Sequence, residues 1–590
     1  MVFLQSGSYS TAMGDSTAET LARRLRVANG TEPGDLLLAG GRVANVFTGA
    51  VVTADVIVAD GWIAGIGPYD WQAAERIDLD GRTIIPGLID AHIHVESTLL
   101  VPAHLAAVVV PHGTSTLIAD PHEIANVMGA AGVELLIDAS TGLGLDIFYM
   151  APSCVPAMPW EHAGATLDAA GIDRLLANPA VLGLAEVMNF PGVLGGDPDV
   201  LSKLATAMRH RAIIDGHAPG VTGRDLVAYA AAGIRSDHEC TDADEAAARG
   251  ALGMLVQVRE GSIARNLDAM LPRIADDTLG DWCLCTDDVD ADELVEKGHI
   301  NGLLKRVVAA GVDPVRAVRH ATLVPARHYG LSDRGAVVPG RRADLVAVDD
   351  LVDFRAAVVV KDGTIVARDG RYEVASNPVP IPVTNTIRLG ALGEPSFALP
   401  LSTPTATVIG IVAEQIVTRR ERLAVKITDG AWCFDADIDA VLIASIERHR
   451  ATGSIGLGLV SGFGFRRHGA IGSSVAHDSH NVIIAGTNPI DMLACARAIE
   501  DAGGGFVVAS GGAVTALVPL PVAGLLATEP AETVRRQLRV AHAAAAELGC
   551  PLATPFGTLS FLALSVIPEL RITDQGLFDV TRQEFAVVAD

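Results

Sequence analysis

The chain has 590 residues, of which 49% are hydrophobic and 19% are charged, and its formal net charge is −26. This hydrophobic content excludes a disordered chain, and the length predicts two to four domains because one core rarely serves so many residues. The negative charge repels phosphate backbones, so we expect no nucleic-acid partner.

The cysteines and the apolar runs bear on the compartment. Seven scattered cysteines without a CxxC pair do not form a disulfide framework. Cys283 and Cys285 alternate along an expected strand, where small buried thiols are more common than metal ligands. The N-terminal segment lacks the pattern of a signal peptide, and no apolar run reaches membrane-spanning length. We therefore expect a cytoplasmic protein with no membrane partner.

The chain begins with an expected extension over residues 1–34 that contains a short helix. Residues 35–82 then form short β-rich runs separated by glycine turns, and the same pattern returns over residues 335–376. We expect these two segments, which flank the central region, to build one small β-sandwich domain together.

Residues 83–334 repeat a strand–loop–helix pattern, which predicts the parallel sheet of a (β/α)₈ TIM-like barrel. The expected strands are 83–90, 114–120, 146–151, 181–187, 212–215, 234–237, 254–259 and 282–287. The α/β fold class therefore follows from the alternation and from the number of repeats.

A proline-rich linker over residues 377–382 precedes an expected separate α/β domain, residues 383–590. Within it we expect helices over 437–448, 491–502 and 534–548. The glycine-rich segment 453–464 lacks the ending of a phosphate-binding loop, and we expect a tight turn between strands there.

Ionisable residues fall where the barrel strands end. His92 and His94 follow the first strand, and their spacing lets both side chains face inward. Later strand ends carry four more candidates: Glu186, His217, His238 and Asp287. Barrel enzymes place their active sites at this face, and so many histidines and carboxylates in one cavity are favourable only around cations. The six residues are the expected ligands of two divalent ions.

The same residues carry a family resemblance. Residues 86–94, PGLIDAHIH, resemble the strand-one motif of the amidohydrolase superfamily, and residues 339–346, PGRRADLV, resemble its return into the small β domain. Many members bridge their metals with a carboxylated lysine from strand four, where this chain has Glu186. With Glu186 at this position the chain resembles the adenine deaminase branch of the superfamily. Four further segments resemble the same branch: residues 96–98, 119–123, 416–420 and 473–481.

The resemblance implies hydrolysis of adenine, a small-molecule purine, to hypoxanthine and ammonia by a metal-activated hydroxide. It implies that His92 and His94 hold one ion, that His217 and His238 hold the other, and that Glu186 bridges them. Asp287 is the expected acid–base residue, with Asp288 as the alternative. The branch suggests Mn²⁺ or Fe²⁺, and Zn²⁺ stays open. We also expect a homo-oligomer, a dimer or higher.

Other residues near these strand ends are candidates for the substrate site. Asp120 and His122 could hold the purine ring or move a proton; alternatively, Asp120 caps a helix and His122 packs in the core. Glu96 and Ser97 could line the pocket. Residues 477–480, His-Asp-Ser-His, invite a second metal site or a triad, but adjacent residues rarely form a triad. The segment could instead close over the barrel mouth or form an ordinary loop.

Two other functions compete with this one. One is another amidohydrolase activity, on a cyclic amide or a different aminopurine, because a fold does not fix a substrate. The other is a non-catalytic barrel scaffold, which we would expect to lack at least one of the six ligands.

Overall fold

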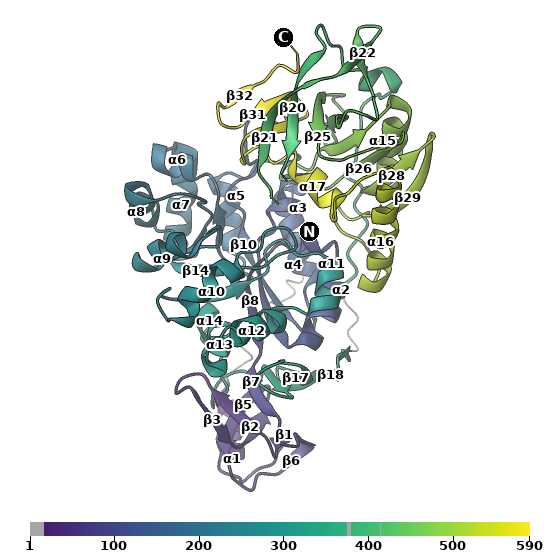
Figure 1. The fold of residues 1–590 in the computed structure, drawn as a ribbon. Coiled ribbons are helices and arrows are strands. Elements are labelled where there is room, and N and C mark those ends of the chain that lie inside the picture. Colours follow the sequence, from purple (N-terminus) through teal and green to yellow (C-terminus); the bar gives the residue numbers. More distant parts are fainter. Residues whose placement is uncertain (1–16, 375–378, 413–414, 590) are drawn as a thin grey trace, which may run out of the picture.

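A computed structural model describes residues 17–374, 379–412 and 415–589. Three parts follow one another along the long axis of the molecule (Figure 1). A small β domain lies at one end, a barrel lies in the middle, and a C-terminal domain covers the opposite end of the barrel.

The small β domain combines segments from both sides of the barrel. One sheet has the order β5-β4-β1-β6 and the other the order β19-β18-β17-β16-β7-β2-β3. In the larger sheet Val346 of β16 pairs with Ile85 of β7, so chain that follows the barrel is hydrogen-bonded to chain that precedes it. Helix α1 packs on the smaller sheet, where Val27 is buried with Leu37 and Trp71. The elements are α1 (Ala18–Ala28), β1 (Gly34–Ala39), β2 (Arg42–Asn45), β3 (Ala50–Thr53), β4 (Asp55–Ala59), β5 (Trp62–Gly67), β6 (Ala73–Asp78), β7 (Thr83–Pro86), β16 (Leu345–Val348), β17 (Ala356–Lys361), β18 (Thr364–Arg368) and β19 (Arg371–Tyr372).

The barrel consists of eight parallel strands in two arcs, β12-β11-β10-β9-β8 and β13-β14-β15. A parallel bridge between Ile93 and Asp287 joins the first strand to the last. The two arcs also meet between β12 and β13, where the backbone amide of Arg235 donates to the carbonyl of Ile214 at 2.9 Å. The strands are β8 (Leu88–Ile93), β9 (Thr114–Ala119), β10 (Asp146–Ala151), β11 (Val181–Val187), β12 (Ile213–Gly216), β13 (Ser236–Asp237), β14 (Leu255–Arg259) and β15 (Trp282–Cys285).

Helices surround these strands. They are η1 (Glu96–Thr98), α2 (Pro102–Val109), η2 (Val110–His112), α3 (His122–Met128), α4 (Ala130–Ala139), α5 (Ala169–Leu176), α6 (Phe190–Gly195), α7 (Pro198–His210), α8 (Gly223–Ala231), α9 (Ala243–Ala251), α10 (Leu267–Ala275), α11 (Ala291–Lys297), α12 (Ile300–Ala309), α13 (Pro314–His320) and α14 (Leu323–His328). Cys283 and Cys285 are buried in the apolar centre of the barrel beside Ile89 and Ile118.

The expected first barrel strand, 83–90, is wrong as a single strand. Its first part is β7 in the small domain, and β8 begins only at Leu88. Gly87 joins the two, and a Cβ atom there would lie 2.2 Å from Oγ of Ser115. Only glycine allows the chain to pass this close to β9 as it moves from one sheet into the other.

The C-terminal domain is built on an eight-stranded sheet of order β21-β20-β25-β24-β27-β26-β28-β29. Its elements are η3 (Glu394–Phe397), β20 (Thr405–Ile411), β21 (Thr418–Ala424), β22 (Lys426–Thr428), β23 (Ala431–Cys433), β24 (Val441–Ile446), β25 (Ile455–Ser461), β26 (Ala470–Ser473), β27 (Val482–Gly486), α15 (Pro489–Ala502), β28 (Gly505–Ser510), β29 (Ala513–Pro519), α16 (Ala531–Glu547), α17 (Pro555–Phe561), β30 (Leu570–Thr573), β31 (Gly576–Asp579) and β32 (Glu584–Phe585).

Two expectations for this domain are wrong. The segment 437–448 contains strand β24 instead of a helix, and all six residues of the strand are buried. The glycine-rich segment 453–464 contains strand β25 instead of a tight turn. A Cβ atom on Gly456 would lie 2.0 Å from the carbonyl oxygen of Thr573, so glycine lets β30 and β31 pack closely over this strand. The expected helices 491–502 and 534–548 coincide with most of α15 and α16.

The C-terminal domain rests on the mouth of the barrel. In α16, Arg535 pairs with Asp292 of α11, and Arg539 lies 2.6 Å from Glu296 of the same helix. On another side of the mouth, the side-chain amide of Asn481 donates to the backbone carbonyl of His162 at 2.8 Å. The carboxyl ends of the barrel strands therefore face the C-terminal domain.

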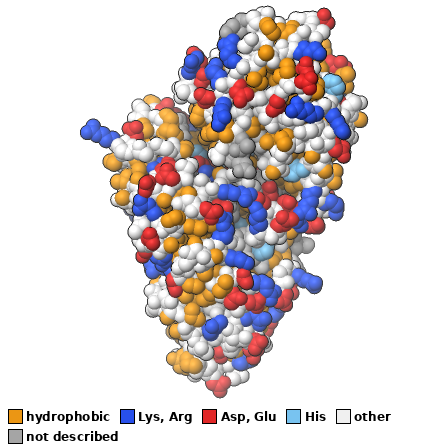
Figure 2. Space-filling view, viewed as in Figure 1, with side chains coloured by type: hydrophobic (Ala, Val, Ile, Leu, Met, Phe, Trp, Pro, Cys, Tyr) orange, Lys and Arg blue, Asp and Glu red, His pale blue; other side chains and the backbone are white. Residues whose placement is uncertain are grey.

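In the described part of the chain, every helix is too short or too polar to cross a membrane. Acidic and basic side chains are interspersed over the face of the molecule in Figure 2. The excess of negative charge is therefore not segregated into one uniform patch on that face.

Candidate active site at the barrel mouth

The six residues expected to bind metal converge at the mouth of the barrel. His92 and His94 lie at the end of β8, Glu186 lies in β11, and His217 and His238 follow β12 and β13. Asp287 follows β15. Five of the side chains are no more than 5% exposed, and that of His217 is 16% exposed. They come from five different strand ends, so the fold of the barrel brings them together.

Asp287 is the centre of one half of this cluster. Its Oδ1 lies 3.0 Å from Nε2 of His94 and 3.4 Å from Nε2 of His92. The two imidazole nitrogens lie 3.3 Å from each other. Asp287 has a φ of 58°, and this left-handed conformation turns its carboxylate back over the end of β8.

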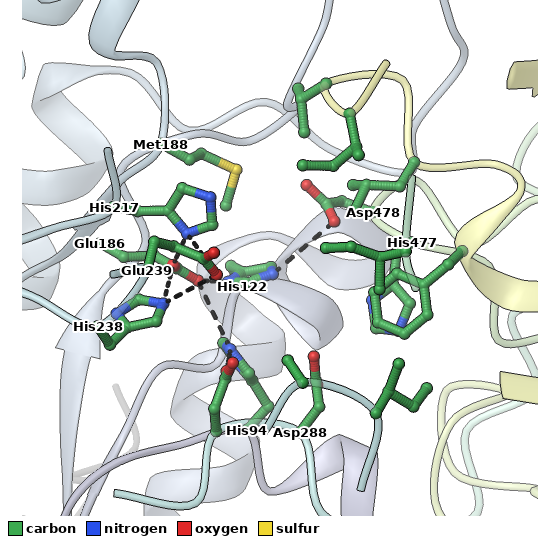
Figure 3. Close-up of a pocket in the computed structure, with 18 of the residues that line it drawn as sticks. His94, His122, Glu186, Met188, His217, His238, Glu239, Asp288, His477 and Asp478 are labelled. Atoms are coloured by element: carbon green, nitrogen blue, oxygen red, sulfur yellow. Dashed lines mark hydrogen bonds and ion pairs between the residues drawn. The ribbon is translucent and has the colours of Figure 1, made fainter. Parts of the chain in front are cut away.

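Glu186 is the centre of the other half. Its Oε2 lies 2.6 Å from Nδ1 of His217 and 3.0 Å from Nε2 of His238. Its Oε1 lies 3.5 Å from Nε2 of His94. One carboxylate therefore faces both histidine pairs, as Figure 3 shows for His94, His217 and His238.

The tautomer of His94 tests whether this cluster fits a metal. Its Nδ1 lies 3.0 Å from the carbonyl oxygen of Asp120, which can only accept a hydrogen bond, so Nδ1 carries the proton. In the neutral ring Nε2 then presents a lone pair, and it faces carboxylate oxygens of Glu186 and Asp287. A buried lone pair that faces carboxylate oxygens is unfavourable, so Nε2 either binds a cation or carries a proton. Without a cation, burial opposes the charged ring, but the hydrogen bond to Asp287 and the neighbouring acidic charges outweigh it and raise the pKa of His94. The residues therefore fit divalent metal ions.

Charges inside the cluster support the ionised carboxylates. Burial opposes ionisation of Glu186, but the charges of His217 and His238 outweigh it and hold the pKa of Glu186 well below its usual range. Asp287 behaves in the same way, because hydrogen bonds to His92 and His94 outweigh its burial and lower its pKa. Both side chains are thus available as anionic ligands.

A small chamber of about 60 Å³ lies directly above these residues. Its floor includes His94, Glu186 and Asp287, and its opposite wall includes Ile416, His477 and Phe561 of the C-terminal domain. The chamber is therefore enclosed by both domains.

Comparisons with known proteins identify the family of the chain. Residues 83–366 match the amidohydrolase family, and residues 415–584 match the adenine deaminase C-terminal domain. The chain is 46% identical to an adenine deaminase of Desulfatibacillum aliphaticivorans over 95% of this chain and 98% of that protein. It is 45% identical to an adenine deaminase of Methanothrix thermoacetophila over 94% and 97% of the two chains. A dihydropyrimidinase structure from Brevibacillus agri aligns at 16% identity with a TM-score of 0.44, over 57% of this chain and 95% of that one.

The chain belongs to the adenine deaminase family of amidohydrolases.

In this member of the family, Asp120 and His122 contribute differently. Oδ1 of Asp120 accepts the backbone amide of His122 at 3.1 Å ahead of α3, while its carbonyl fixes the ring of His94. His122 lines the chamber, where its Nδ1 lies 3.4 Å from Oε1 of Glu186. Asp120 thus supports two histidines, and His122 faces the space where a substrate would lie.

Glu96 and Ser97 are not among the residues that line the chamber. Oε1 of Glu96 accepts the backbone amide of Ile124 at 2.9 Å, so this side chain points to α3. Burial raises the pKa of Glu96 to about 7. The hydroxyl of Ser97 donates to Asp288, and Ser97 lines a second cavity beside the chamber. A local sequence pattern cannot separate these orientations, because both residues follow the His-x-His motif closely.

Residues 477–480 close over the chamber through hydrogen bonds to Glu123 of α3. Nδ1 of His477 lies 2.5 Å from Oε1 of Glu123, and Nε2 of His480 pairs with Oε2. Nδ1 of His480 accepts the backbone amide of Ala476 at 3.1 Å, so its Nε2 carries the proton and donates. That tautomer is incompatible with a metal ligand at Nε2, so the segment is a hydrogen-bonded clamp.

Two functional candidates were missed in the sequence. Nη2 of Arg259 lies 3.1 Å from Glu239, and its Nη1 lies 3.0 Å from Oδ2 of Asp287. Glu239 lies 3.7 Å from Nδ1 of His217. Arg259 is the last residue of β14, so its position at a strand end was the available signal. Glu239 directly follows His238, but its role depends on contacts that only the fold creates.

Proposed function

We propose that this chain hydrolyses adenine to hypoxanthine and ammonia at a binuclear metal centre. The observation that carries the proposal is the position of Glu186 between two histidine pairs, in a chain 46% identical to an adenine deaminase over 95% of its length. A scaffold that had lost catalysis would not need to keep six ionisable residues, five of them buried, facing one another.

The residues divide into two proposed sets of ligands. His92, His94 and Asp287 would hold one ion, and His217 and His238 would hold the other, with Glu186 shared between them. We propose Mn²⁺, with Fe²⁺ or Zn²⁺ as alternatives, because imidazole and carboxylate suit all three. When bound, such ions supply the positive charge that makes water a good nucleophile near neutral pH.

Asp287 is the proposed acid–base residue. Its Oδ1 faces the histidines, and its Oδ2 is held by Arg259, so the carboxylate is fixed at the edge of the chamber. It would accept a proton from the water that attacks C6 of the purine and pass it to the amino group, which leaves as ammonia. Asp288 is the alternative: it lines the same chamber, and burial and the charge of Asp287 raise its pKa.

The purine itself would lie against the opposite wall. His122 is proposed to hold the ring, since it stands between Glu186 and Asp478, whose Oδ1 lies 4.0 Å from its Nε2. Burial raises the pKa of Asp478 to about 6, so a protonated fraction could donate to a ring nitrogen. The C-terminal domain would thus contribute directly to substrate binding.

Steady-state rates on a panel of aminopurines and cyclic ureides, measured with added Mn²⁺, test the proposal. We expect adenine to be deaminated with the highest kcat/KM of the panel. Hydrolysis of a cyclic ureide with adenine left unchanged would show a different amidohydrolase activity. Elemental analysis of the same preparation tests the scaffold alternative, which predicts clearly less than about one metal ion per chain.

A further inference from the structure

A second and larger cavity, of about 290 Å³, adjoins the chamber. It lies between α11 of the barrel and helices α16 and α17 of the C-terminal domain. The two cavities share four lining residues, which are Ile263, Asp288, His477 and Phe561. These four residues therefore lie at the boundary between the two cavities.

Flat rings line much of this cavity. Phe506 and Phe556 are stacked with centroids 4.8 Å apart and an angle of 7° between their planes. His542 also stacks with Phe556, with ring centroids 5.9 Å apart. At the boundary, Phe561 stacks on His477 at 4.5 Å and 19°. Such walls favour a planar aromatic ligand, which can pack face to face or edge to face against them.

One buried polar group in this cavity lacks a partner. Ser560 in α17 is 3% exposed, and its Oγ makes no hydrogen bond with any residue that the structure describes. A buried hydroxyl without a partner is destabilising, so such groups commonly mark a place for a ligand or a water molecule. Ser560 lines the cavity together with Phe556 and Phe561 of the same helix.

The charges around the cavity exclude one class of ligand. Five carboxylates line it, together with Lys297, Arg539 and two histidines, His477 and His542. The carboxylates are Asp288, Asp290, Asp292, Glu293 and Glu296. Phosphate groups would be repelled here, whereas a neutral base with amino and ring N–H donors could hydrogen-bond to the acidic rim.

We propose that this cavity is a vestibule that binds a neutral purine base before the base enters the chamber. The base would stack on the phenylalanine rings, bond to the hydroxyl of Ser560, and pass into the chamber between Ile263 and Phe561. The purine identity of this ligand rests on the proposed function, whereas the planar and uncharged character rests on the walls of the cavity.

Substitutions that place a larger side chain in the vestibule test the proposal. In the metal-loaded enzyme, Ser560→Leu should lower kcat/KM for adenine by about tenfold or more, with kcat reduced less and metal content unchanged. Gly557→Val is a second variant, because a Cβ atom there would lie 2.9 Å from Cδ1 of Ile263 at the boundary. Thr558→Leu, on the same helix but outside the cavity lining, is the matched control and should leave kcat/KM unchanged.

Binding of the product hypoxanthine to the metal-loaded chain gives a readout independent of turnover. Equilibrium dialysis should show one hypoxanthine fewer per chain for Ser560→Leu than for the unsubstituted chain. Equal stoichiometry, or unchanged kcat/KM in both filled variants, would overturn the vestibule. A third result would separate the two proposals. If the unsubstituted chain did not act on adenine, but Ser560→Leu still bound one hypoxanthine fewer than the unsubstituted chain, the proposed function would fail and the vestibule would stand.

Discussion

Arg259 and Asp287 lie 3.0 Å apart, from Nη1 of the arginine to Oδ2 of the aspartate, while Oδ1 of the same aspartate faces His92 and His94. The two oxygens of one carboxylate therefore have different partners. Arg259 is in turn paired with Glu239, so the arginine is held between two acids and its own pKa is raised despite its burial. This arrangement would keep Asp287, a proposed metal ligand, in a fixed orientation.

Asp287→Asn separates the two proposed roles of this residue, which are metal binding and proton transfer. Asparagine tolerates the φ of 58° at this position, so the backbone should not change, and the remaining ligands should retain much of the metal. The amide cannot accept the proton, so we expect kcat to fall by about 10²- to 10⁴-fold. The measurement is kcat together with metal content of the same preparation. A near-normal rate would show that another group, such as Asp288, moves the proton.

Glu186→Gln should have a different signature. Glutamine keeps the shape of the side chain but removes the charge that His217 and His238 face at 2.6 and 3.0 Å. We expect metal content and activity to fall together, with loss of a metal ligand costing about tenfold or more in affinity. Elemental analysis and kcat across a series of metal concentrations check this. Full metal occupancy without activity would argue against a shared ligand.

The residues proposed to bind the metals could be predicted because they obey local rules. His92 and His94 alternate on one strand, and Glu186, His217, His238 and Asp287 each end a strand of a parallel barrel, so their convergence follows from the fold class. The order of strands along the chain fixes which residues meet, even where β13 is only two residues long.

Other features could not be predicted because they depend on distant contacts. Glu123 and His477 are separated by 354 positions, and no periodicity in either segment indicates that they meet. The sequence of β24 predicts a helix as readily as a strand, because a strand buried on both faces is a continuous apolar run, which a buried helix also shows. The orientation of Glu96 depends on the backbone of α3, which no residue near Glu96 specifies.

His480→Asn tests the clamp between the barrel and the C-terminal domain. His480 has a φ of 53°, which asparagine accommodates, and the shorter side chain can still accept the amide of Ala476 but cannot reach Glu123. A buried carboxylate that loses a partner costs about 1–3 kcal/mol, so we expect a lower thermal midpoint and reduced kcat/KM.

The matched control for the clamp is His104→Asn. His104 also joins the barrel to the C-terminal domain, with Nε2 at 3.0 Å from the carbonyl of Thr528, but this contact is exposed. Its loss should change stability by no more than about 0.5 kcal/mol. Equal effects of the two substitutions would mean that the hydrogen bond to Glu123 contributes no more to stability than this exposed contact does.

Glu161 gives the protein a dependence of stability on pH that lies outside the metal cluster. Burial, together with the charge of Asp478, raises the pKa of Glu161 from 4.5 to about 8, although Ser565 donates a hydrogen bond to it at 2.9 Å. A raised pKa means that the folded state prefers the protonated acid. The associated stability is complete below pH 4.5 and is lost as the pH rises through about 8.

Glu161→Gln removes this titration and should leave the remaining contacts in place. Near pH 4.5 the variant should be as stable as the unsubstituted chain. As the pH rises it should become more stable than the unsubstituted chain, by up to about 5 kcal/mol above pH 8. Thermal midpoints of both proteins from pH 4.5 to 9 measure the difference, with Glu134→Gln, at an exposed ion pair with Arg174, as the control. A constant difference across this range would show that Glu161 is ionised in the folded protein, because only a group that gains or loses a proton on unfolding makes the difference vary with pH.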